Sequence, residues 1–368
     1  MVLYINGNYP HHSLHGELVS KLADLGNDIT VFVPMRGREL EGKYRCDHPG
    51  VEVIYCDCLR SLDRVFFIHK IRKIAREIEK RIDLKQINCI LAGTVYSDGG
   101  VAYLLHRKYG IPFSVAARET DVTYQMKWRP YLNGFVKHLL GRASKLVFLS
   151  PAYKKYFDRF DSNQDKCVII PNAVNDYWFQ ESQGERRIHN PASLIFVGEI
   201  SKRKNVGTAI MAVAELKNSG FLTVFHIVGS GDEEENCRAL AKRLGVENQV
   251  FFHGWQNDKE KIKEFYDQAD IFVMPSHRET FGTVYVEALS QGLPIIYTKG
   301  QGIDGYFEQG EVGYSCDPND KRDIKEAIIH IIDNYESISG MCISASKRFQ
   351  WKEVSSQYND VINSMRNN

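Results

Sequence analysis

The chain has 368 residues, of which 43% are hydrophobic and 25% are charged, and this length and composition fit a globular protein of about two domains. The sequence contains no run of about 18 apolar residues, so we expect no membrane-spanning helix. The N-terminal MVLYING lacks the basic region of a secretory signal, so we expect a cytoplasmic protein. The eight cysteines have no CxxC spacing and the net charge is +1, so we expect neither a zinc site nor a nucleic-acid partner.

The near-zero net charge conceals an asymmetry between the two halves. Residues 1–175 carry a formal charge of +8, and residues 176–368 carry −7. A basic first half favours an anionic partner or surface. The alternative is that two domains simply differ in surface composition.

The first half alternates apolar runs with amphipathic stretches. Strands are predicted at 2–5, 29–33, 51–55, 89–93, 113–117, 145–150 and 167–170, and helices at 13–25, 65–82, 99–109 and 131–142. Strands that alternate with helices of this length indicate a parallel sheet covered on both faces.

A polar stretch at 180–192 resembles an interdomain connector, and the alternation then resumes. Strands are predicted at 194–198, 223–229, 250–254, 270–275 and 294–297, and helices at 206–218, 232–244, 259–268, 282–291, 320–334 and 351–365. We therefore predict an α/β fold with two Rossmann-like domains, 1–175 and 176–350, facing each other across a cleft, and a C-terminal helix at 351–368. Ligands are expected at the carboxyl ends of the strands.

Two glycine-rich or basic loops of the second half are candidate phosphate sites. IFVGEISKRKNV (195–206) places Lys202, Arg203 and Lys204 between a strand and a helix, where cations and free N–H groups favour oxyanions. A solvated basic loop is the alternative. HIVGSGDEEE (226–235) places Gly229 after a strand, where glycine permits close approach of a ligand, although Asp232 is also an ordinary helix N-cap.

The stretch HRETFGTVYVEAL (277–289) carries two glutamates around the predicted start of a helix. The first N–H groups of a helix are unpaired, so those of Phe281, Gly282 and Thr283 are candidates for binding phosphate or sugar oxygens. Glu279 precedes the helix and can accept hydrogen bonds from sugar hydroxyls. Glu287 lies one turn further on and suits the two hydroxyls of a ribose.

Five segments together resemble glycosyltransferase family 4, whose members have the GT-B fold and use nucleotide-sugar donors with retention. The segments are PNAVN (171–175), FVGEISKRKN (196–205), IVGSGDEEE (227–235), FHGW (252–255) and PSHRETFGTVYVEALSQGLPII (275–296). The resemblance covers essentially the whole chain, and its last segment is the most specific. It also implies that the C-terminal helix packs back across both domains.

The resemblance assigns roles to individual residues. Catalytic roles fall to Glu279, which contacts the donor sugar, to Lys204, which neutralises the diphosphate, and to Arg118. Donor binding is expected from Gly7, Lys202, Arg203, Gly229, Thr280, Phe281, Gly282, Thr283 and Glu287. The sequence departs from the family at Glu199, where an Arg is usual, and at Arg118, where many members have a His. Arg118 could bind a phosphate or an acidic acceptor, or could form a structural pair with Asp121.

The implied reaction is retaining transfer of a hexose or N-acetylhexosamine to a hydroxyl of a glycan or lipid-linked acceptor, as in bacterial surface polysaccharide synthesis. UDP is the expected nucleotide and GDP its main competitor. No cofactor or metal is expected, because no DxD-type motif stands in the right place. The alternatives are a non-hydrolysing sugar-nucleotide epimerase and a catalytically silent binding partner.

Acceptor-side candidates are His11, His12 and His15, in the loop after the first strand, and Asp121. Three clustered histidines also permit a metal site, but an acceptor or phosphate contact is the preferred interpretation. Segments 64–85 and 124–142 mix cations with apolar and aromatic residues, which favours peripheral contact with the inner face of a membrane. An ordinary helix with a solvated basic face is the alternative.

Overall fold

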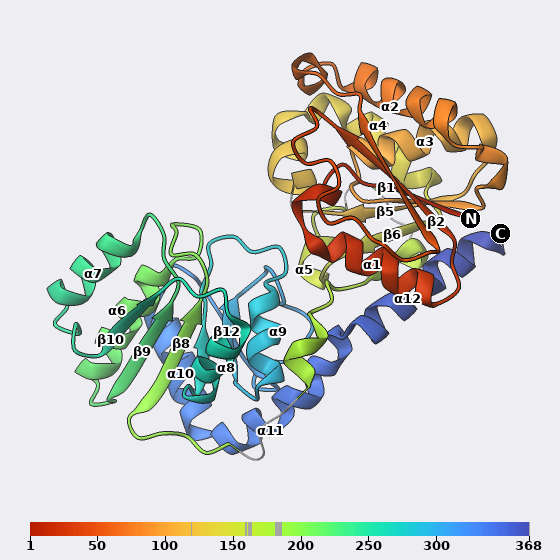
Figure 1. Ribbon diagram of the computed structural model, residues 1–368. Coiled ribbons are helices and arrows are strands. Elements are labelled where there is room, and N and C mark those ends of the chain that lie inside the picture. The colour runs from red at the N-terminus through yellow and green to blue at the C-terminus, as the bar shows by residue number, and fades with distance from the viewer. Residues whose placement is uncertain (119, 159, 161–163, 181–185, 368) are drawn as a thin grey trace. The chain divides into compact units, whose positions relative to one another are not determined.

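The computed structural model describes residues 1–118, 120–158, 160, 164–180 and 186–367, and the chain forms two compact units (Figure 1). The first unit contains residues 1–172 and 351–368, and the second contains residues 173–350. The units therefore divide after Asn172, three residues before the predicted boundary, and the C-terminal helix belongs to the first unit. Residues 181–185 of the predicted connector lie outside the described residues.

The first unit is built on a seven-stranded parallel sheet in the order β3-β2-β1-β4-β5-β6-β7. The strands are β1 (Val2–Ile5), β2 (Ile29–Met35), β3 (Val51–Asp57), β4 (Cys89–Ala92), β5 (Phe113–Ala117), β6 (Lys145–Phe148) and β7 (Cys167–Ile169). Every residue of β1, β2, β4 and β5 is buried, as expected for strands covered by helices on both faces.

Two helix layers cover this sheet (Figure 1). One layer contains α1 (Ser13–Asp24) and α12 (Trp351–Arg366), and the other contains α2 (Phe67–Arg81), α3 (Ser97–Tyr109) and α4 (Asn133–Arg142). The first unit also contains three short elements: the helix α5 (Pro151–Lys154), a 3₁₀ turn at Ser61–Arg64 and a π-helix at Asp121–Met126. The helix α12 is held by a hydrogen bond from Trp351 Nε1 to Glu17 Oε2 at 2.8 Å.

The second unit has a six-stranded parallel sheet in the order β10-β9-β8-β11-β12-β13. Its strands are β8 (Ala192–Val197), β9 (Thr223–Val228), β10 (Val250–Gly254), β11 (Ile271–Val273), β12 (Ile295–Thr298) and β13 (Gly313–Cys316). One helix layer contains α6 (Val206–Asn218), α7 (Glu234–Arg243) and α10 (Lys321–Asp333), and the other contains α8 (Lys259–Asp267), α9 (Thr283–Ser290) and α11 (Tyr335–Ser346).

Both units are Rossmann-like, which confirms the predicted α/β fold class. In each sheet the direction of winding reverses once, between β1 and β4 in the first unit and between β8 and β11 in the second. Ligands of open parallel sheets bind at the carboxyl ends of the strands beside such a reversal. The loops after β1, β4, β8 and β11 are therefore the places where functional side chains are expected.

Candidate active site

In the second unit, the loops after β8 and β11 bring Lys204 and Glu279 into contact. Lys204 Nζ donates a hydrogen bond to Glu279 Oε2 at 2.6 Å, and Arg203 Nη1 lies 3.7 Å from the same oxygen. The side chains of Lys204 and Glu279 are only 12% and 9% exposed. The structure thus joins two of the three residues predicted to be catalytic in a largely buried charge pair at the winding reversal.

Backbone hydrogen bonds hold these two loops together. The N–H of His277 donates to the carbonyl of Arg203 at 2.9 Å, and Asn205 Nδ2 donates to the carbonyl of Pro275 at 2.9 Å. Asn205 has a left-handed backbone with a φ of 58°, which asparagine tolerates better than most residues. It was missed by sequence reasoning, although an Asn directly before a predicted helix is a common N-cap signal.

Glu279 is fixed from its own backbone as well. Its N–H donates to Gln301 Oε1 at 2.9 Å, and its carbonyl accepts from the N–H of Gly302 at 3.0 Å. Sequence reasoning missed Gln301, because it lies 22 residues away along the chain and no local signal connects it with Glu279.

The helix α9 begins at Thr283, one residue after the glycine that was predicted to begin it. Gly282 is the N-cap, with a φ of 81° and no side-chain capping hydrogen bond. A Cβ at this position would lie 2.5 Å from Tyr285 Cδ2, so glycine is required both by the backbone and by the space. Because the first turn of a helix has N–H groups without intrahelical acceptors, this uncapped end suits an anionic ligand.

Phe281 and Thr280 were predicted to bind the donor through their backbone. The Phe281 side chain is buried against Phe349, with ring centroids 5.5 Å apart, and therefore belongs to the core. The N–H of Thr280 donates to Glu279 Oε1 at 3.1 Å. A ligand role for either residue through its backbone remains a prediction.

Glu287 lies on α9 and not beside the cationic loop, by which we mean the loop after β8 that carries Lys202, Arg203 and Lys204. Burial raises the pKa of its carboxyl from 4.5 to about 7, and the charge of Lys259 partly opposes this shift. In the part of the chain that the structure describes, no side chain or backbone N–H donates to this carboxylate. An uncompensated, partly buried carboxylate is suited to ligand hydroxyls that would donate to it.

Three other positions of the second unit are explained without a ligand. Gly229 has a φ of 151°, and a Cβ there would lie 1.8 Å from the carbonyl oxygen of Gly198, so glycine lets the loops after β8 and β9 pass each other. Lys202 is exposed and forms an ion pair with Glu233 at 3.8 Å. Glu199 is exposed. Donor contacts by Gly229 and Lys202 stay predictions.

In the first unit, Asp121 is a structural residue. It is buried, and its carboxylate accepts from the N–H groups of Val95, Tyr96 and Arg118 at 2.9 to 3.2 Å. Burial raises its pKa to about 6, and these hydrogen bonds oppose the shift. It therefore ties the loop after β5 to the loop after β4 and is closed to an acceptor in this structure.

The Arg118 guanidinium does not form the side-chain pair with Asp121 that was considered from the sequence. Its Nη1 donates to Asn172 Oδ1 at 3.2 Å, and its Nε donates to the carbonyl of Gly93 at 3.4 Å. Both are hydrogen bonds to neutral groups. The positive charge of Arg118 is thus held at the carboxyl end of β4, and its catalytic role remains a prediction.

The three histidines of the loop after β1 have different environments. His11 and His12 are exposed, whereas His15 is buried and hydrogen-bonded through Nδ1 to the Tyr4 hydroxyl at 3.1 Å. Burial, followed by the charge of Arg118, lowers the pKa of His15 to about 3, so it is neutral. Among the described residues, no group of three or more His, Cys, Asp or Glu side chains could hold a metal ion.

Gly7 lies beside the buried carboxyl of Asp98. The N–H of Gly7 donates to Asp98 Oδ1 at 3.3 Å, and Thr94 Oγ1 donates to Asp98 Oδ2 at 3.0 Å. Burial raises the pKa of Asp98 to about 7, while the charge of Lys70 lowers it. Asp98 thereby shapes the loop after β1, and the close approach of a phosphate to Gly7 stays a prediction.

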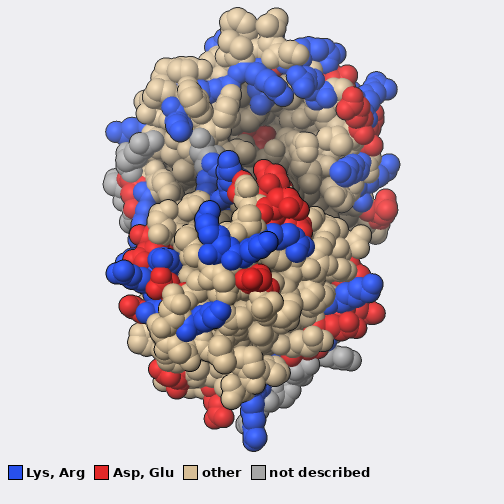
Figure 2. Space-filling model, turned by 90° about the vertical axis from the view of Figure 1, so that its left-hand side faces the viewer, with Lys and Arg blue, Asp and Glu red and all other residues tan. Residues whose placement is uncertain are grey.

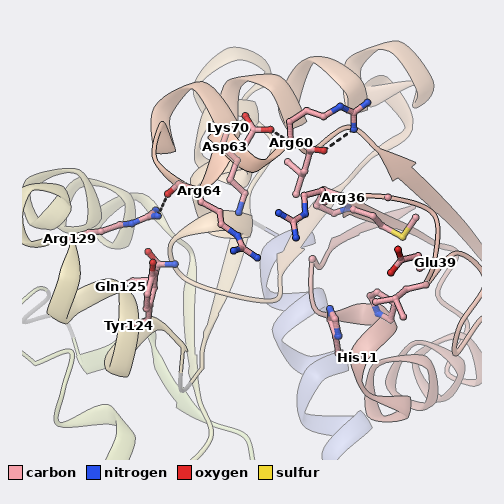
Figure 3. Close-up of a pocket in the computed structure, with 17 residues that line it drawn as sticks. His11, Arg36, Glu39, Arg60, Asp63, Arg64, Lys70, Tyr124, Gln125 and Arg129 are labelled. Carbon is pink, nitrogen blue, oxygen red and sulfur yellow. Dashed lines mark hydrogen bonds between the residues drawn. The ribbon is translucent and has the colours of Figure 1, made fainter.

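A pocket of about 660 Å³ opens next to Gly7 and His11 (Figure 3). Five basic side chains line it, and sequence reasoning had identified none of them as site residues: Arg36, Arg60, Arg64, Lys70 and Arg129. Figure 2 shows Lys and Arg side chains gathered on the first unit, in the upper part of the view. Five of the 26 Lys and Arg residues of positions 1–175 are therefore gathered at this pocket.

Comparison with known proteins agrees with this geometry. Residues 179–348 match the family described as glycosyl transferases group 1, and residues 16–177 match the family described as glycosyltransferase family 4. The lipopolysaccharide core biosynthesis glycosyltransferase LpsE of Rhizobium meliloti (strain 1021) is 35% identical over 236 residues, which are 59% of this chain and 67% of LpsE. Seven other curated relatives are matched over 39% to 56% of their own length.

Solved structures share the whole fold at low sequence identity. Anabaena Alr3699/HepE in complex with UDP has a TM-score of 0.73 at 18% identity, covering 99% of both chains. The lipopolysaccharide outer core galactosyltransferase WaaB, in its apo form, has a TM-score of 0.75 at 15% identity, also covering 99% of both chains. Within the described residues, no helix has both the length and the apolar character needed to cross a membrane.

Proposed function

The chain belongs to glycosyltransferase family 4, the group 1 glycosyltransferases with the GT-B fold, and from this premise we propose that it transfers a hexose or N-acetylhexosamine, with retention, from a UDP-sugar to a hydroxyl of a glycan or lipid-linked acceptor. The observation that carries the proposal is the contact between Lys204 and Glu279 beside the uncapped start of α9. In this arrangement, cations and N–H groups are available to bind a diphosphate. The carboxylate of Glu279 is available to accept hydrogen bonds from sugar hydroxyls.

In the proposed reaction, the bond between the anomeric carbon and the diphosphate oxygen breaks, and its electron pair goes to the diphosphate. The acceptor oxygen bonds to the anomeric carbon on the same face, and its proton passes to a phosphate oxygen. Lys204 and the first N–H groups of α9 stabilise the negative charge that develops on the leaving group. Lys204 then exchanges part of its interaction with Glu279 for the diphosphate, which frees Glu279 to accept from the sugar.

The choice of UDP and of a surface polysaccharide is supported by similar proteins. HepE structures contain UDP, UDP with glucose, and UDP-glucose, and LpsE and WaaB are named for lipopolysaccharide synthesis. We further propose that no metal cofactor is required, because Lys204 and the helix N-terminus supply positive potential where the diphosphate would bind.

The proposal is tested by measuring release of UDP from UDP-glucose, UDP-galactose and UDP-N-acetylglucosamine, with and without EDTA. Lys204→Met is expected to lower turnover by about 10²- to 10³-fold, because it removes a cation that stabilises the leaving group. Lys242→Met, on the exposed face of α7, is the matched control and should retain wild-type turnover.

Three results would contradict the proposal. Equal turnover in Lys204→Met and the wild type would show that the diphosphate binds elsewhere. Isomerisation of the sugar without transfer or hydrolysis would identify an epimerase. Binding of all donors without turnover would identify a silent binding protein.

A further inference from the structure

Besides the loop after β1, three separate segments line the basic pocket of the first unit. The loop after β2 contributes Arg36, the turn before α2 and the first turn of that helix contribute Arg64 and Lys70, and the π-helix and the residues after it contribute Tyr124 and Arg129. Arg129 joins the last two segments, since its Nη2 donates to the carbonyl of Arg64 and its guanidinium lies 5.8 Å from the ring centroids of Phe67 and Tyr124. The pocket is therefore a built feature of the fold.

Positive charge in this pocket exceeds the negative charge available to neutralise it. The side chains of Arg36, Arg64 and Lys70 point toward one another across the pocket in Figure 3. Within the described chain none of the three has a carboxylate partner, and Arg36 reaches only the Ser61 hydroxyl, at 3.4 Å. Like charges that converge without counter-ions raise the energy of the empty pocket.

The carboxylates near the pocket are already engaged or lie to one side. Asp63 accepts from Lys73 Nζ at 3.1 Å and from the N–H of Arg60 at 2.7 Å. Asp57 accepts from Arg60 Nη1 at 2.9 Å, which turns that guanidinium away from Arg64 (Figure 3). Glu39 lines the pocket from the same loop as Arg36 and is exposed to solvent.

Lys70 is one of the two partly buried cations of the pocket, together with Arg129. Burial lowers its pKa, and the nearby charge of Arg129 acts in the same direction, whereas Asp98 and Asp63 oppose the shift. Asp98 is itself buried and bonded to Thr94 and Gly7. The Lys70 ammonium group, with the guanidinium groups of Arg36 and Arg64 beside it, matches a ligand with several anionic oxygens. Guanidinium groups bind phosphate through paired N–H donors.

Exposed apolar and aromatic residues adjoin the pocket cations in the chain. Leu62, Val65 and Phe66 flank Arg64, and Tyr124, Trp128 and Tyr131 are close in sequence to Arg129; their exposed fractions lie between 51% and 69%. We call these six residues the apolar rim. Lys127 stands over the Trp128 ring at 5.6 Å. Exposed aromatic and aliphatic side chains mixed with cations are typical of a surface that contacts an anionic lipid interface.

We propose that this pocket binds the phosphate or diphosphate group of a lipid-linked acceptor, while the apolar rim contacts the membrane that carries it. The inference rests on the proposed function, since it identifies the chemical class of the acceptor for that transfer. The apolar rim selects a lipid-linked phosphate over a water-soluble one.

The experiment uses the full chain, saturated with UDP to occupy the donor site, and vesicles of phosphatidylcholine alone, with a polyprenyl diphosphate, or with phosphatidylglycerol at equal charge. Co-sedimentation is expected to be strongest with the polyprenyl diphosphate. Arg64→Gln and Lys70→Met should each weaken this binding by about 10- to 100-fold, the effect of losing one charge-assisted hydrogen bond. Arg76→Gln removes an exposed charge from the same helix outside the pocket and should bind as the wild type does.

A second pair of measurements separates the lipid from the phosphate. Phe66→Ser should weaken vesicle binding but leave calorimetric binding of inorganic pyrophosphate unchanged, whereas Arg64→Gln should weaken both. Equal binding of phosphatidylglycerol and polyprenyl diphosphate, or an equal loss in Arg76→Gln, would overturn the pocket as the binding site. Pyrophosphate binding without any vesicle binding would overturn the lipid-linked source.

Failure of this inference is distinguishable from failure of the proposed function. Hydrolysis of the UDP-sugar without an acceptor depends on Lys204, and it is measured on the wild type and on Arg76→Gln, which lies outside the pocket and should hydrolyse the donor equally. Normal hydrolysis with unselective vesicle binding would overturn the acceptor class alone. Absent hydrolysis in every protein, with selective binding to the diphosphate, would overturn the transferase proposal and retain the pocket.

Discussion

The two glutamates of one short segment, Glu279 and Glu287, are held in opposite electrostatic environments. Glu279 is bonded to Lys204 and lies near Arg203, so its negative charge is compensated before any ligand binds. Glu287 has only the more distant charge of Lys259 to offset its burial. The difference follows from position, because one glutamate precedes α9 beside the cationic loop and the other lies on the helix itself.

Donor binding should therefore depend on pH through Glu287. The folded-state pKa of about 7 lies above the ordinary 4.5, so between these values the folded protein holds a proton that the unfolded chain has released. Without ligand, stability should fall as pH rises through this interval. Ribose hydroxyls donate more strongly to the ionised carboxylate, so UDP affinity should rise over the same range.

Calorimetric titration of UDP between about pH 5 and pH 8 checks this expectation, together with thermal unfolding of the free protein. Glu287→Gln should bind UDP more weakly and lose the pH dependence of both quantities that this group causes. A wild-type affinity that is flat across the range, or a Gln variant with an unchanged pH profile, would rule out Glu287 as a ligand of the nucleotide.

For individual residues, the sequence predicted which side chains belong to the site better than it predicted whether a side chain is buried or accessible. Lys204 and Glu279 were predicted to act together, and both follow strands that flank the winding reversal. His15 and Asp121 looked equally suitable for an acceptor, but both are buried and bonded within the protein. Burial of a polar residue depends on what packs over it from distant parts of the chain, and no local pattern contains that information.

Among the elements, the loops after β8 and β9 are coupled by a backbone contact that only glycine permits. The N–H of Ile200 donates to the carbonyl of Ser230 at 2.9 Å, and a Cβ on Gly229 would lie 1.8 Å from the Gly198 oxygen. The loop that begins at Gly198 continues to Lys204. The geometry of the cationic loop thus depends on a residue with no charge of its own.

Gly229→Ala should destabilise the protein by about 3 kcal/mol or more, because strained backbone and overpacking add, and should displace the Lys204 loop. Gly207→Ala is the matched control, since Gly207 lies within α6 and its Cβ would make an ordinary 3.5 Å contact with Leu240. That change should be neutral or stabilise by about 0.5–1 kcal/mol. Urea unfolding of both variants measures the difference, and similar midpoints would contradict the steric argument.

The order of strands and helices was predictable because the buried strands are apolar and the helices are amphipathic. One strand and one helix of the second unit were missed for identifiable reasons. The strand β13 has the sequence GYSC and lies at the edge of its sheet, so little of it is apolar. The helix α11 (YESISGMCISAS) packs small residues against α9, and small or polar buried residues such as Ser339 leave no clear apolar stripe.

For the whole molecule, the division of the chain explains why the predicted domain boundary was three residues late. The sequence PNAVN looked like the end of the first domain, but Val174 already belongs to the second unit. Its N–H donates to the carbonyl of Phe349 at 2.9 Å, and it pairs with Gln350. A bridge between residues 176 positions apart is invisible to any local reading of the sequence.

Because this bridge brings the two ends of residues 173–350 together, the second unit should fold when produced alone. Its hydrophobic core is formed by its own residues, and the Lys204–Glu279 contact lies within it. The fragment should show cooperative thermal unfolding and bind UDP, and Lys204→Met in the fragment should weaken that binding.

Residues 1–172 alone should be less stable to thermal unfolding than the 173–350 fragment, because they lack α12. The α12 residues Trp351, Val354, Tyr358 and Ile362 are buried in the first unit. Joining 172 to 351 through a short Gly-Ser linker should restore cooperative unfolding, and a linked first unit that stays unfolded while the 173–350 fragment folds would show that the first unit depends on the second for its stability.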